Sequence, residues 1–325
     1  MPARFSSAFS LLLLAAPAAA GDTLLYLEGQ GVAGYSSAAA APVYHSMSAA
    51  DAMQKSSAGF DLVHKFYGEA GDAGTLAVQA RLAWDKDAPN RLEPQLYNAY
   101  YRLRTPYGYA WAGHNRAAAG LESYTDTHGA LLQTLPMYGY GLDRDWGAGW
   151  SRDFDGGNAA ASLTTGSGMR LRGAGGWLAG ARAAAGVLNS DNYTAGLYLS
   201  AGEVPWTAGY TLVDGALRRY SAAGADLTLL WDAWELRADL RGGRMRGMAY
   251  IAGLGRLGFN VLPEGGLKLE AQAVYSGMER MEGWIVSAGA SYALTPYLTL
   301  RAACERDVPM NDRRVTGQVY YYLPI

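Results

Sequence analysis

The chain has 325 residues, of which 50% are hydrophobic and 17% are charged, and its formal net charge is −2. Soluble domains carry about 25% charged residues, and a charge so close to zero does not indicate a nucleic-acid partner. The hydrophobic content is too high for a disordered chain. Past residue 20, no run approaches the roughly 18 apolar residues that a membrane-spanning helix needs.

The first twenty residues read as a cleaved signal peptide. Arg4 supplies a positive start, residues 11–16 form a short apolar segment, and the alanines at 18–20 match the small-residue pattern of a cleavage site. We therefore expect the mature chain to begin at Gly21. An uncleaved anchor helix is the alternative, but the apolar segment is short for one. The single cysteine, Cys304, fits an exported protein without disulfides.

The mature chain repeats with a period of two, which is typical of strands. Residues 234–241 alternate between apolar and charged at every step, a separation that a helix would not produce. Sixteen such segments are predicted, at 23–35, 56–67, 75–85, 94–104, 107–115, 138–152, 157–166, 176–187, 191–202, 223–232, 233–242, 247–260, 266–276, 283–294, 297–307 and 315–325.

The links between these segments alternate in length. Tight, turn-rich links follow even-numbered segments, and longer links, at 36–55, 116–137, 167–175, 203–222 and 308–314, follow odd-numbered ones. Short turns at one end and longer loops at the other are typical of an outer-membrane barrel. We predict an all-β, transmembrane, antiparallel up-and-down barrel of about sixteen strands over 21–325, with short periplasmic turns and longer extracellular loops.

A soluble β-sandwich also alternates in this way, so three further features decide the choice. Opposite the apolar face lies a face of charged, amide and small residues that is too polar for a core. The last strand places apolar residues at every second position from Val315 to Ile325. Aromatic residues of the apolar face gather near strand ends, as in membrane-interface girdles, at Tyr97, Tyr101, Trp111, Trp146, Trp150, Trp177, Trp231, Trp234 and Trp284.

With these features the chain resembles the Gram-negative outer-membrane porins. The ending 319–325 is similar to the C-terminal signal that the barrel assembly machinery recognises, although it ends in Ile325 after Pro324. The resemblance implies an outer-membrane location, contact with lipid and lipopolysaccharide, and a homotrimer. The small outward residues Ala159, Ala161, Ala179, Ala181, Ala183 and Ala185 are the predicted protomer contact.

The resemblance also implies that the long link 116–137 folds into the channel and narrows it. Arg116, Glu122, Asp126 and His128 would then belong to a constriction, with the leucines at 131, 132 and 135 pinning the segment to the wall. The alternative, an ordinary outward loop, stays open at this point.

Charged residues of both signs fall on the predicted inner face, where water in a sixteen-stranded barrel would hydrate them. Together they would set up a transverse field; pairing in salt bridges within the wall is the alternative. The pore-lining and constriction candidates are Arg81, Arg102, Arg104, His114, Arg116, Glu122, Asp126, Arg182, Glu235, Arg237, Asp239, Arg241, Lys268, Glu270, Arg301 and Glu305. Glu28, Asp143, Asp145 and Asp226 share this inner face.

The sequence offers no catalytic, metal or cofactor motif. The favoured hypothesis is a porin, not an enzyme, that allows passive diffusion of ions and small hydrophilic solutes. A barrel that sheathes or anchors a partner, such as an outer-membrane cytochrome, is the alternative. A lipid-modifying barrel enzyme using His45 or His128 with a nearby serine is a distant third.

Overall fold

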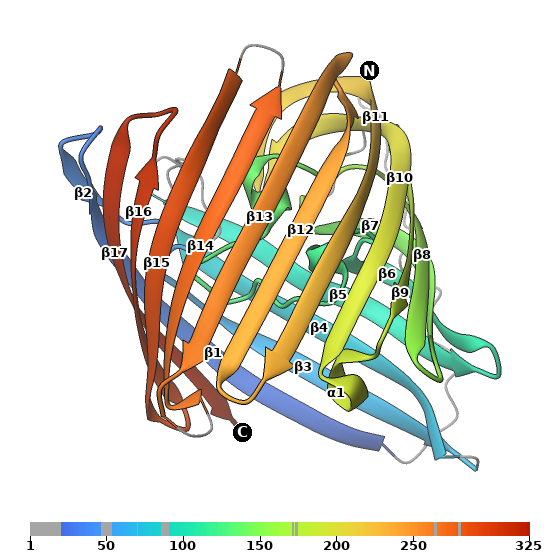
Figure 1. Cartoon of the computed structure of the whole chain (residues 1–325). Helices are drawn as coiled ribbons and strands as arrows, with labels where there is room; N and C mark the ends of the chain where they lie inside the picture. The colour runs from blue at the N-terminus through green and yellow to red at the C-terminus, as the bar shows by residue number, and fades with distance from the viewer. Residues whose placement is uncertain are drawn as a thin grey trace, which may run out of the picture.

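The computed structural model describes residues 21–46, 54–69, 71–85, 91–170, 172, 175–262, 265–278 and 281–325. The predicted signal peptide lies outside them. The described strands form one antiparallel sheet of seventeen strands that closes on itself (Figure 1). None of the described helices is long and apolar enough to cross a membrane.

Sixteen long strands make the wall, and the three-residue β2 pairs with the last residues of β1. The strands are β1 (Gly21–Ser36), β2 (Ala41–Val43), β3 (Ser57–Gly68), β4 (Gly71–Trp84), β5 (Leu92–Thr105), β6 (Gly108–Arg116), β7 (Arg144–Phe154), β8 (Gly157–Thr164), β9 (Trp177–Ala185), β10 (Tyr193–Ala208), β11 (Thr211–Trp231), β12 (Trp234–Met245), β13 (Met248–Asn260), β14 (Leu267–Met278), β15 (Met281–Thr295), β16 (Leu298–Asp307) and β17 (Asp312–Pro324). The short helices are η1 (Leu121–Ser123), η2 (Leu135–Tyr138) and α1 (Leu188–Asp191).

The barrel closes where the first strand pairs with the last. β1 and β17 run antiparallel from the pair Tyr26 and Pro324 to the pair Ser36 and Arg314. Closure satisfies the backbone groups of both edges, which is the condition for strands to cross a membrane. All sixteen predicted segments overlap a strand of this wall, so the predicted fold class is confirmed.

The connections differ between the two halves of the chain. At the end of the barrel that carries Gly21 and Ile325, most turns are short, such as 106–107, 155–156, 232–233 and 296–297. At the other end, long connections occur only up to β9, and β10 joins β11 through residues 209–210 alone. The predicted long link 203–222 is therefore wrong. Register shifts beside Val204 and Trp206 accommodate Pro205 within the hairpin, so that β10 and β11 continue through this range.

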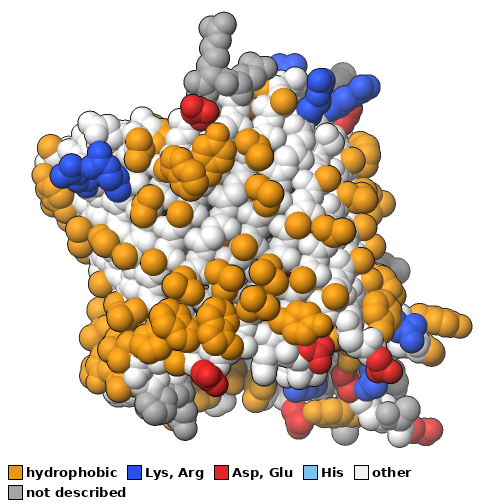
Figure 2. Space-filling view, viewed as in Figure 1, with side chains coloured by type: hydrophobic (Ala, Val, Ile, Leu, Met, Phe, Trp, Pro, Cys, Tyr) orange, Lys and Arg blue, Asp and Glu red, His pale blue; other side chains and the backbone are white. Residues whose placement is uncertain are grey.

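The outer surface of the wall is apolar. In β10, Leu197 and Leu199 are 71% and 61% exposed, whereas Tyr198 and Ser200 between and beside them are buried. Figure 2 shows hydrophobic side chains over the middle of the outer face and charged side chains near its two ends. This distribution suits lipid, because an outward Arg or Lys at the bilayer midplane costs about 2 to 4 kcal/mol.

Two aromatic residues expected on the lipid face lie inside instead. Tyr97 has no exposed surface and Trp111 is buried. The register of β4 and β5 shifts between Leu96 and Asn98, so that a bulge reverses the alternation at Tyr97. The phenol of Tyr97 consequently meets Arg81 inside the barrel, where the Arg81 guanidinium donates to its oxygen at 2.8 Å.

Candidate functional site

The connection 117–143 between β6 and β7 lies within the barrel (Figure 1) and contacts residues of distant strands. The Leu121 amide donates to Asp239 on β12 at 3.1 Å, and the Trp206 indole on β10 donates to the Gly139 carbonyl at 3.2 Å. Leu121 and Leu135 also belong to an apolar cluster with Tyr250 and other residues of the β10–β14 wall. One flank of the segment is thus packed against that part of the wall.

A buried charge cluster reinforces this contact. The guanidinium of Arg241 on β12 donates to Glu122 and to Asp239, both at 2.8 Å, and to the Tyr140 carbonyl at 2.8 Å. The Tyr198 hydroxyl on β10 donates to the other Asp239 oxygen at 2.6 Å. Glu122, Asp239 and Arg241 are each at most 2% exposed, so this cluster is shielded from water. We call it the anchor.

The anchor holds two carboxyl groups against one guanidinium. Burial raises the pKa of Glu122 to about 8, and nearby Asp239 acts in the same direction, while Arg241 opposes the rise. A protonated Glu122 leaves one negative and one positive charge, which is the cheaper arrangement out of water. Near neutral pH the cluster is therefore electrically balanced.

A second contact holds the segment to β11. Arg182 on β9 donates two hydrogen bonds to the Asp226 carboxylate, at 2.8 and 2.6 Å. The Tyr124 hydroxyl donates to Asp226 at 2.9 Å, and its ring lies beneath the Arg182 guanidinium. Paired guanidinium and carboxylate forks have a fixed geometry, so Tyr124 docks onto a rigid support.

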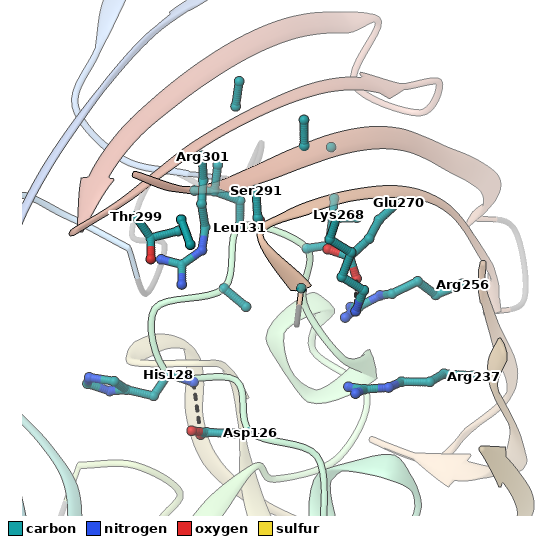
Figure 3. Close-up of a pocket in the computed structure, with 17 residues that line it drawn as sticks. Asp126, His128, Leu131, Arg237, Arg256, Lys268, Glu270, Ser291, Thr299 and Arg301 are labelled. Atoms are coloured by element: carbon teal, nitrogen blue, oxygen red, sulfur yellow. Dashed lines mark hydrogen bonds and ion pairs between the residues drawn. The ribbon is translucent and has the colours of Figure 1, made fainter. Parts of the chain in front are cut away.

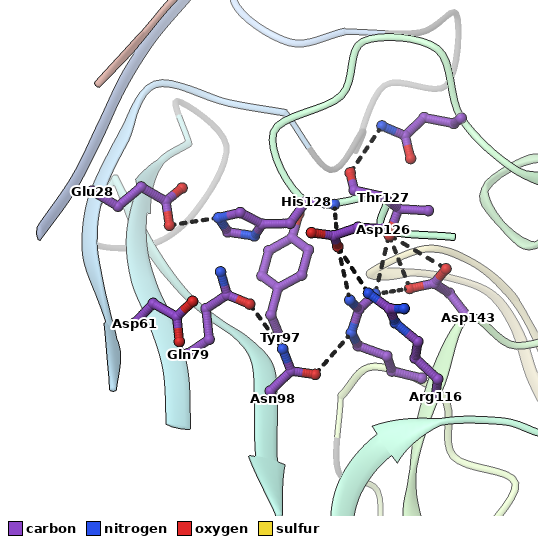
Figure 4. Close-up of polar contacts among 12 residues, drawn as sticks. Glu28, Asp61, Gln79, Tyr97, Asn98, Arg116, Asp126, Thr127, His128 and Asp143 are labelled. Atoms are coloured by element: carbon purple, nitrogen blue, oxygen red, sulfur yellow. Dashed lines mark hydrogen bonds and ion pairs between the residues drawn. The ribbon is translucent and has the colours of Figure 1, made fainter. Parts of the chain in front are cut away.

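The tip of the segment reaches the opposite wall (Figure 4). The His128 imidazole bonds to Glu28 on β1 at 2.6 Å, and Arg81 on β4 lies 3.4 Å from the same carboxylate. The His128 ring also meets Tyr97 edge to face. Burial lowers the pKa of His128, although Glu28 opposes this effect.

Asp126 lies where the segment meets β6 and β7. Its carboxylate is 3.1 Å from Arg116 and 3.4 Å from Arg144 (Figure 4). Partial loss of hydration beside the segment disfavours its ionisation, but the Arg116 and Arg144 guanidinium groups outweigh this effect and lower the pKa of Asp126. Arg144 in addition pairs with Asp143 and donates to Thr127 at 3.0 Å.

A cavity of about 370 Å³ separates the tip from the β12–β16 wall (Figure 3). Four basic residues line it, Arg237, Arg256, Lys268 and Arg301, against two acidic ones, Asp126 and Glu270. In Figure 3 the guanidinium groups of the three arginines point into the space between the wall and the segment. We call this the open side.

The basic charge on the open side is only partly neutralised. Lys268 lies 2.9 Å from Glu235 and 3.2 Å from Glu270, and Arg237 also pairs with Glu235. Arg256 instead donates to the neutral acceptors Gln272 and Gln133, at 2.8 and 3.1 Å.

Arg301 resembles Arg256 in this respect. It donates to Gln318 at 3.0 Å and stacks over Tyr320. Within the described residues, no carboxylate lies in ion-pair distance of Arg256 or Arg301. Two full positive charges thus face the cavity.

A second cavity, of about 290 Å³, lies beside the start of the segment. Arg102, Arg116, Asn98 and Ser123 are among the residues that line it. Arg102 stacks over Tyr109. The segment 117–143 therefore borders two polar cavities as well as the packed wall.

The sequence-predicted site residues fall into distinct groups. The first cavity is lined by Asp126, Arg237, Lys268, Glu270 and Arg301, and Glu235 pairs with two of these residues. The second cavity is lined by Arg102 and Arg116. The buried charge clusters contain Arg81, Glu122, Arg182, Asp239 and Arg241. Three others stand apart from both cavities: Arg104 is exposed near a short turn, His114 has no exposed surface and lies beside Trp146, and Glu305 accepts a bond from Ser287 at 3.3 Å.

Sequence reasoning missed Arg256 and Arg144. The inward face of β13 carries the apolar residues Tyr250, Ala252 and Leu254. In the sequence this face therefore looks like the lipid-facing one, and Arg256 is not recognised as an inward residue. A signal did exist, because the tight turn at 246–247 puts Arg256 directly opposite Arg237. Arg144 is missed because the predicted segment 138–152 puts its neighbours Asp143 and Asp145 on the inner face, whereas β7 begins only at Arg144.

The described residues contain no group of three or more His, Cys, Asp or Glu that could hold a metal ion. Neither a protein-family model nor a curated protein sequence matches the chain. Solved structures do match.

The anion-selective porin of Comamonas acidovorans superposes with a TM-score of 0.65 at 13% identity, covering 94% of this chain and 100% of the porin. OmpF of Salmonella typhi, in complex with daunomycin, gives 0.65 at 13% identity, with 93% and 97% covered. OmpT, an outer membrane protein of Vibrio cholerae, gives 0.61 at 12%, with 93% and 97% covered.

These similarities define the fold class of the protein. The chain is a porin-like β-barrel with sixteen long strands and an apolar outer surface. Barrels of this kind are typical of the outer membrane of Gram-negative bacteria. At such low identity the likeness extends to the fold and not to a particular porin.

Proposed function

We propose that the chain forms a water-filled channel for passive diffusion of ions and small hydrophilic solutes. The observation that carries this proposal is the charged cavity of about 370 Å³ between residues 126–132 and the β12–β16 wall. Barrels of sixteen strands are wide enough to hold an aqueous channel. The segment 117–143 then acts as the constriction.

The channel prefers anions in this proposal. Basic residues outnumber acidic ones around the cavity, and Arg237 and Arg256 stand directly opposite each other on β12 and β13. Adjacent like charges repel, so an anion between them is attracted. The solved porin from Comamonas acidovorans that this fold resembles is itself described as anion-selective.

A planar-bilayer experiment tests the proposal. The purified barrel should give stepwise conductance, and in a salt gradient its reversal potential should have the sign of anion preference. A folded barrel without conductance would contradict the channel, whereas a conducting barrel with cation preference would contradict only the selectivity.

The alternatives have less support. A barrel that sheathes a partner needs a free interior, and here the chain's own segment 117–143 is bonded to both β1 and β12. The proposal includes no catalytic step and no cofactor.

Assembly partners are part of the same proposal. The last strand, β17, ends in apolar outward residues at Val319 and Tyr321, and we propose it as the segment that the barrel assembly machinery recognises. The alanines of β8 and β9 remain the proposed contact in a homotrimer.

A further inference from the structure

Two arginines face outward, side by side, near the end of the barrel opposite Gly21 and Ile325. Arg306 on β16 and Arg313 on β17 are direct partners in the antiparallel ladder, one pair before the connecting turn 308–311. Both are exposed. Directly opposed side chains of a sheet have Cβ atoms about 4.5 to 5.5 Å apart, and like charges in that position destabilise the pairing.

Among the residues that the structure describes, no carboxylate lies in ion-pair distance of either arginine, and the exposed Glu282 of β15 accepts a bond from Tyr275 instead. The neighbouring carboxylates Asp307 and Asp312 are buried on the inner face, where Asp312 accepts bonds from Ser36 and lies 3.3 Å from Arg314. Within the described residues, neither the Arg306 nor the Arg313 side chain has a hydrogen-bond or ion-pair partner. The pair therefore lacks a counter-ion of its own.

The surroundings of the pair are those of a membrane interface. Val286 lies opposite Arg306 on β15, and Val315 follows Arg313 on the same face; both are more than half exposed. Trp284, also exposed, is joined to the turn through the bond from the Val308 amide at 3.0 Å. Exposed tryptophans at strand ends mark the headgroup level of a bilayer.

We propose that Arg306 and Arg313 bind the phosphate of an outer-leaflet glycolipid whose acyl chains lie against β15–β17. A phosphate accepts bidentate bonds from guanidinium groups and supplies the negative charge that the pair lacks. A lipid is the occupant because the site borders apolar surface that acyl chains cover, as Figure 2 shows for hydrophobic side chains below the basic groups at the β16–β17 end. This site is separate from the channel and does not depend on it.

The test compares thermal unfolding of the purified barrel with and without lipid. Diphosphorylated lipid A is added to barrels in neutral detergent, and the unfolding temperature is read from heat-dependent electrophoretic mobility. The matched arms use dephosphorylated lipid A and inorganic phosphate at the same concentrations. The double variant Arg306→Gln/Arg313→Gln is set against Arg104→Gln/Arg152→Gln, which removes the same charge from exposed positions near the opposite end.

Lipid A should raise the unfolding temperature of the wild-type barrel and of the control variant. The Arg306→Gln/Arg313→Gln variant should lose at least half of that rise. Without lipid, the same variant should unfold at the wild-type temperature or above it, because its repulsion is gone, which also shows that it folds.

Several results would overturn the proposal. One is that lipid A does not raise the unfolding temperature of the wild-type barrel. Another is that it raises the unfolding temperature of the Arg306→Gln/Arg313→Gln variant as much as that of wild type. A third is that dephosphorylated lipid A or inorganic phosphate raises the unfolding temperature of wild type as much as lipid A does. A lower unfolding temperature of that variant without lipid would instead give the pair a structural role and would also overturn it.

Discussion

The two sides of the segment 117–143 use charge in opposite ways. On the docked side, toward β10–β12, Arg241 is enclosed with Glu122 and Asp239 and is at most 1% exposed. On the open side, Arg256 and Arg301 face a cavity and are bonded to neutral groups. The same residue type therefore fixes the segment on one side and charges the passage on the other.

The bonding partners account for this difference, because Arg256 is itself only 6% exposed. On the docked side two carboxyl groups surround Arg241, and such close partners offset the cost of burying its charge. Arg256 and Arg301 have neutral acceptors instead, so their charge is not cancelled and their field extends into the cavity. Whether an arginine in the lumen has a carboxylate partner thus indicates its role better than the presence of an arginine at that position does.

The largest effect is expected from breaking the docked side. Arg241→Ala leaves the Asp239 charge buried without its partner, and removal of one member of a buried pair costs roughly 3 to 5 kcal/mol. The free energy of unfolding, measured by denaturant titration, should fall by that amount. The single-channel conductance should rise because the segment is released. Unchanged stability and conductance would contradict the anchor.

The pH dependence of stability should distinguish two carboxyl groups of the segment. Since the pKa of Glu122 is raised from 4.5 to about 8, its contribution is fully present below pH 4.5 and is lost as the pH rises through about 8. Glu122→Gln should flatten the unfolding free energy over that range. Asp126, whose pKa is lowered, contributes stability above its unfolded pKa that is lost on acidification, so Asp126→Asn should flatten only the acidic end. The reverse assignment would contradict the geometry.

Selectivity should follow the open side. Arg256→Gln/Arg301→Gln removes two charges from the cavity, and a unit charge at 4 Å in water contributes about 1 kcal/mol. We expect a several-fold fall in the anion-to-cation permeability ratio, read from reversal potentials in a salt gradient. Asp126→Asn, on the facing segment, should shift the ratio the other way. Equal ratios in all three proteins would separate these residues from the ion path.

The smallest effect on stability is expected at Arg237, the open-side counterpart of Arg241. Arg237 pairs with Glu235, but its side chain is 22% exposed. Partly hydrated pairs of this kind contribute about 0.2 to 1 kcal/mol, so Arg237→Ala should lower the unfolding free energy by no more than that. A loss as large as that of Arg241→Ala would erase the distinction between the two sides.

The sequence predicts the wall better than the interior. Period-two alternation locates all sixteen long strands because every strand has one face toward lipid. It fails at Tyr97, where a bulge reverses the alternation in β5, and at Pro205, where register shifts allow β10 to continue to Ala208. Both failures are local departures from regular pairing that residue types alone do not specify.

The interior depends on contacts between residues far apart in the chain. Parity places Asp239 and Arg241 in the interior, and the resemblance to porins adds Glu122, but the contact of Glu122 with Arg241 joins residues 119 positions apart. Parity likewise does not separate the buried Arg241 from Arg237, four residues away on the same face of β12. Only the position of segment 117–143 decides which of the two is sealed.

Thiol labelling during single-channel recording tests this account most directly. With Cys304 replaced by Ser, a cysteine is placed at Ser291, which lines the open cavity, or at Ala252, which is fully buried on the docked side. A charged, water-soluble thiol reagent should reduce the current through Ser291→Cys and leave that through Ala252→Cys unchanged. Equal block of both, or block at Ala252→Cys alone, would contradict a passage confined to the open side.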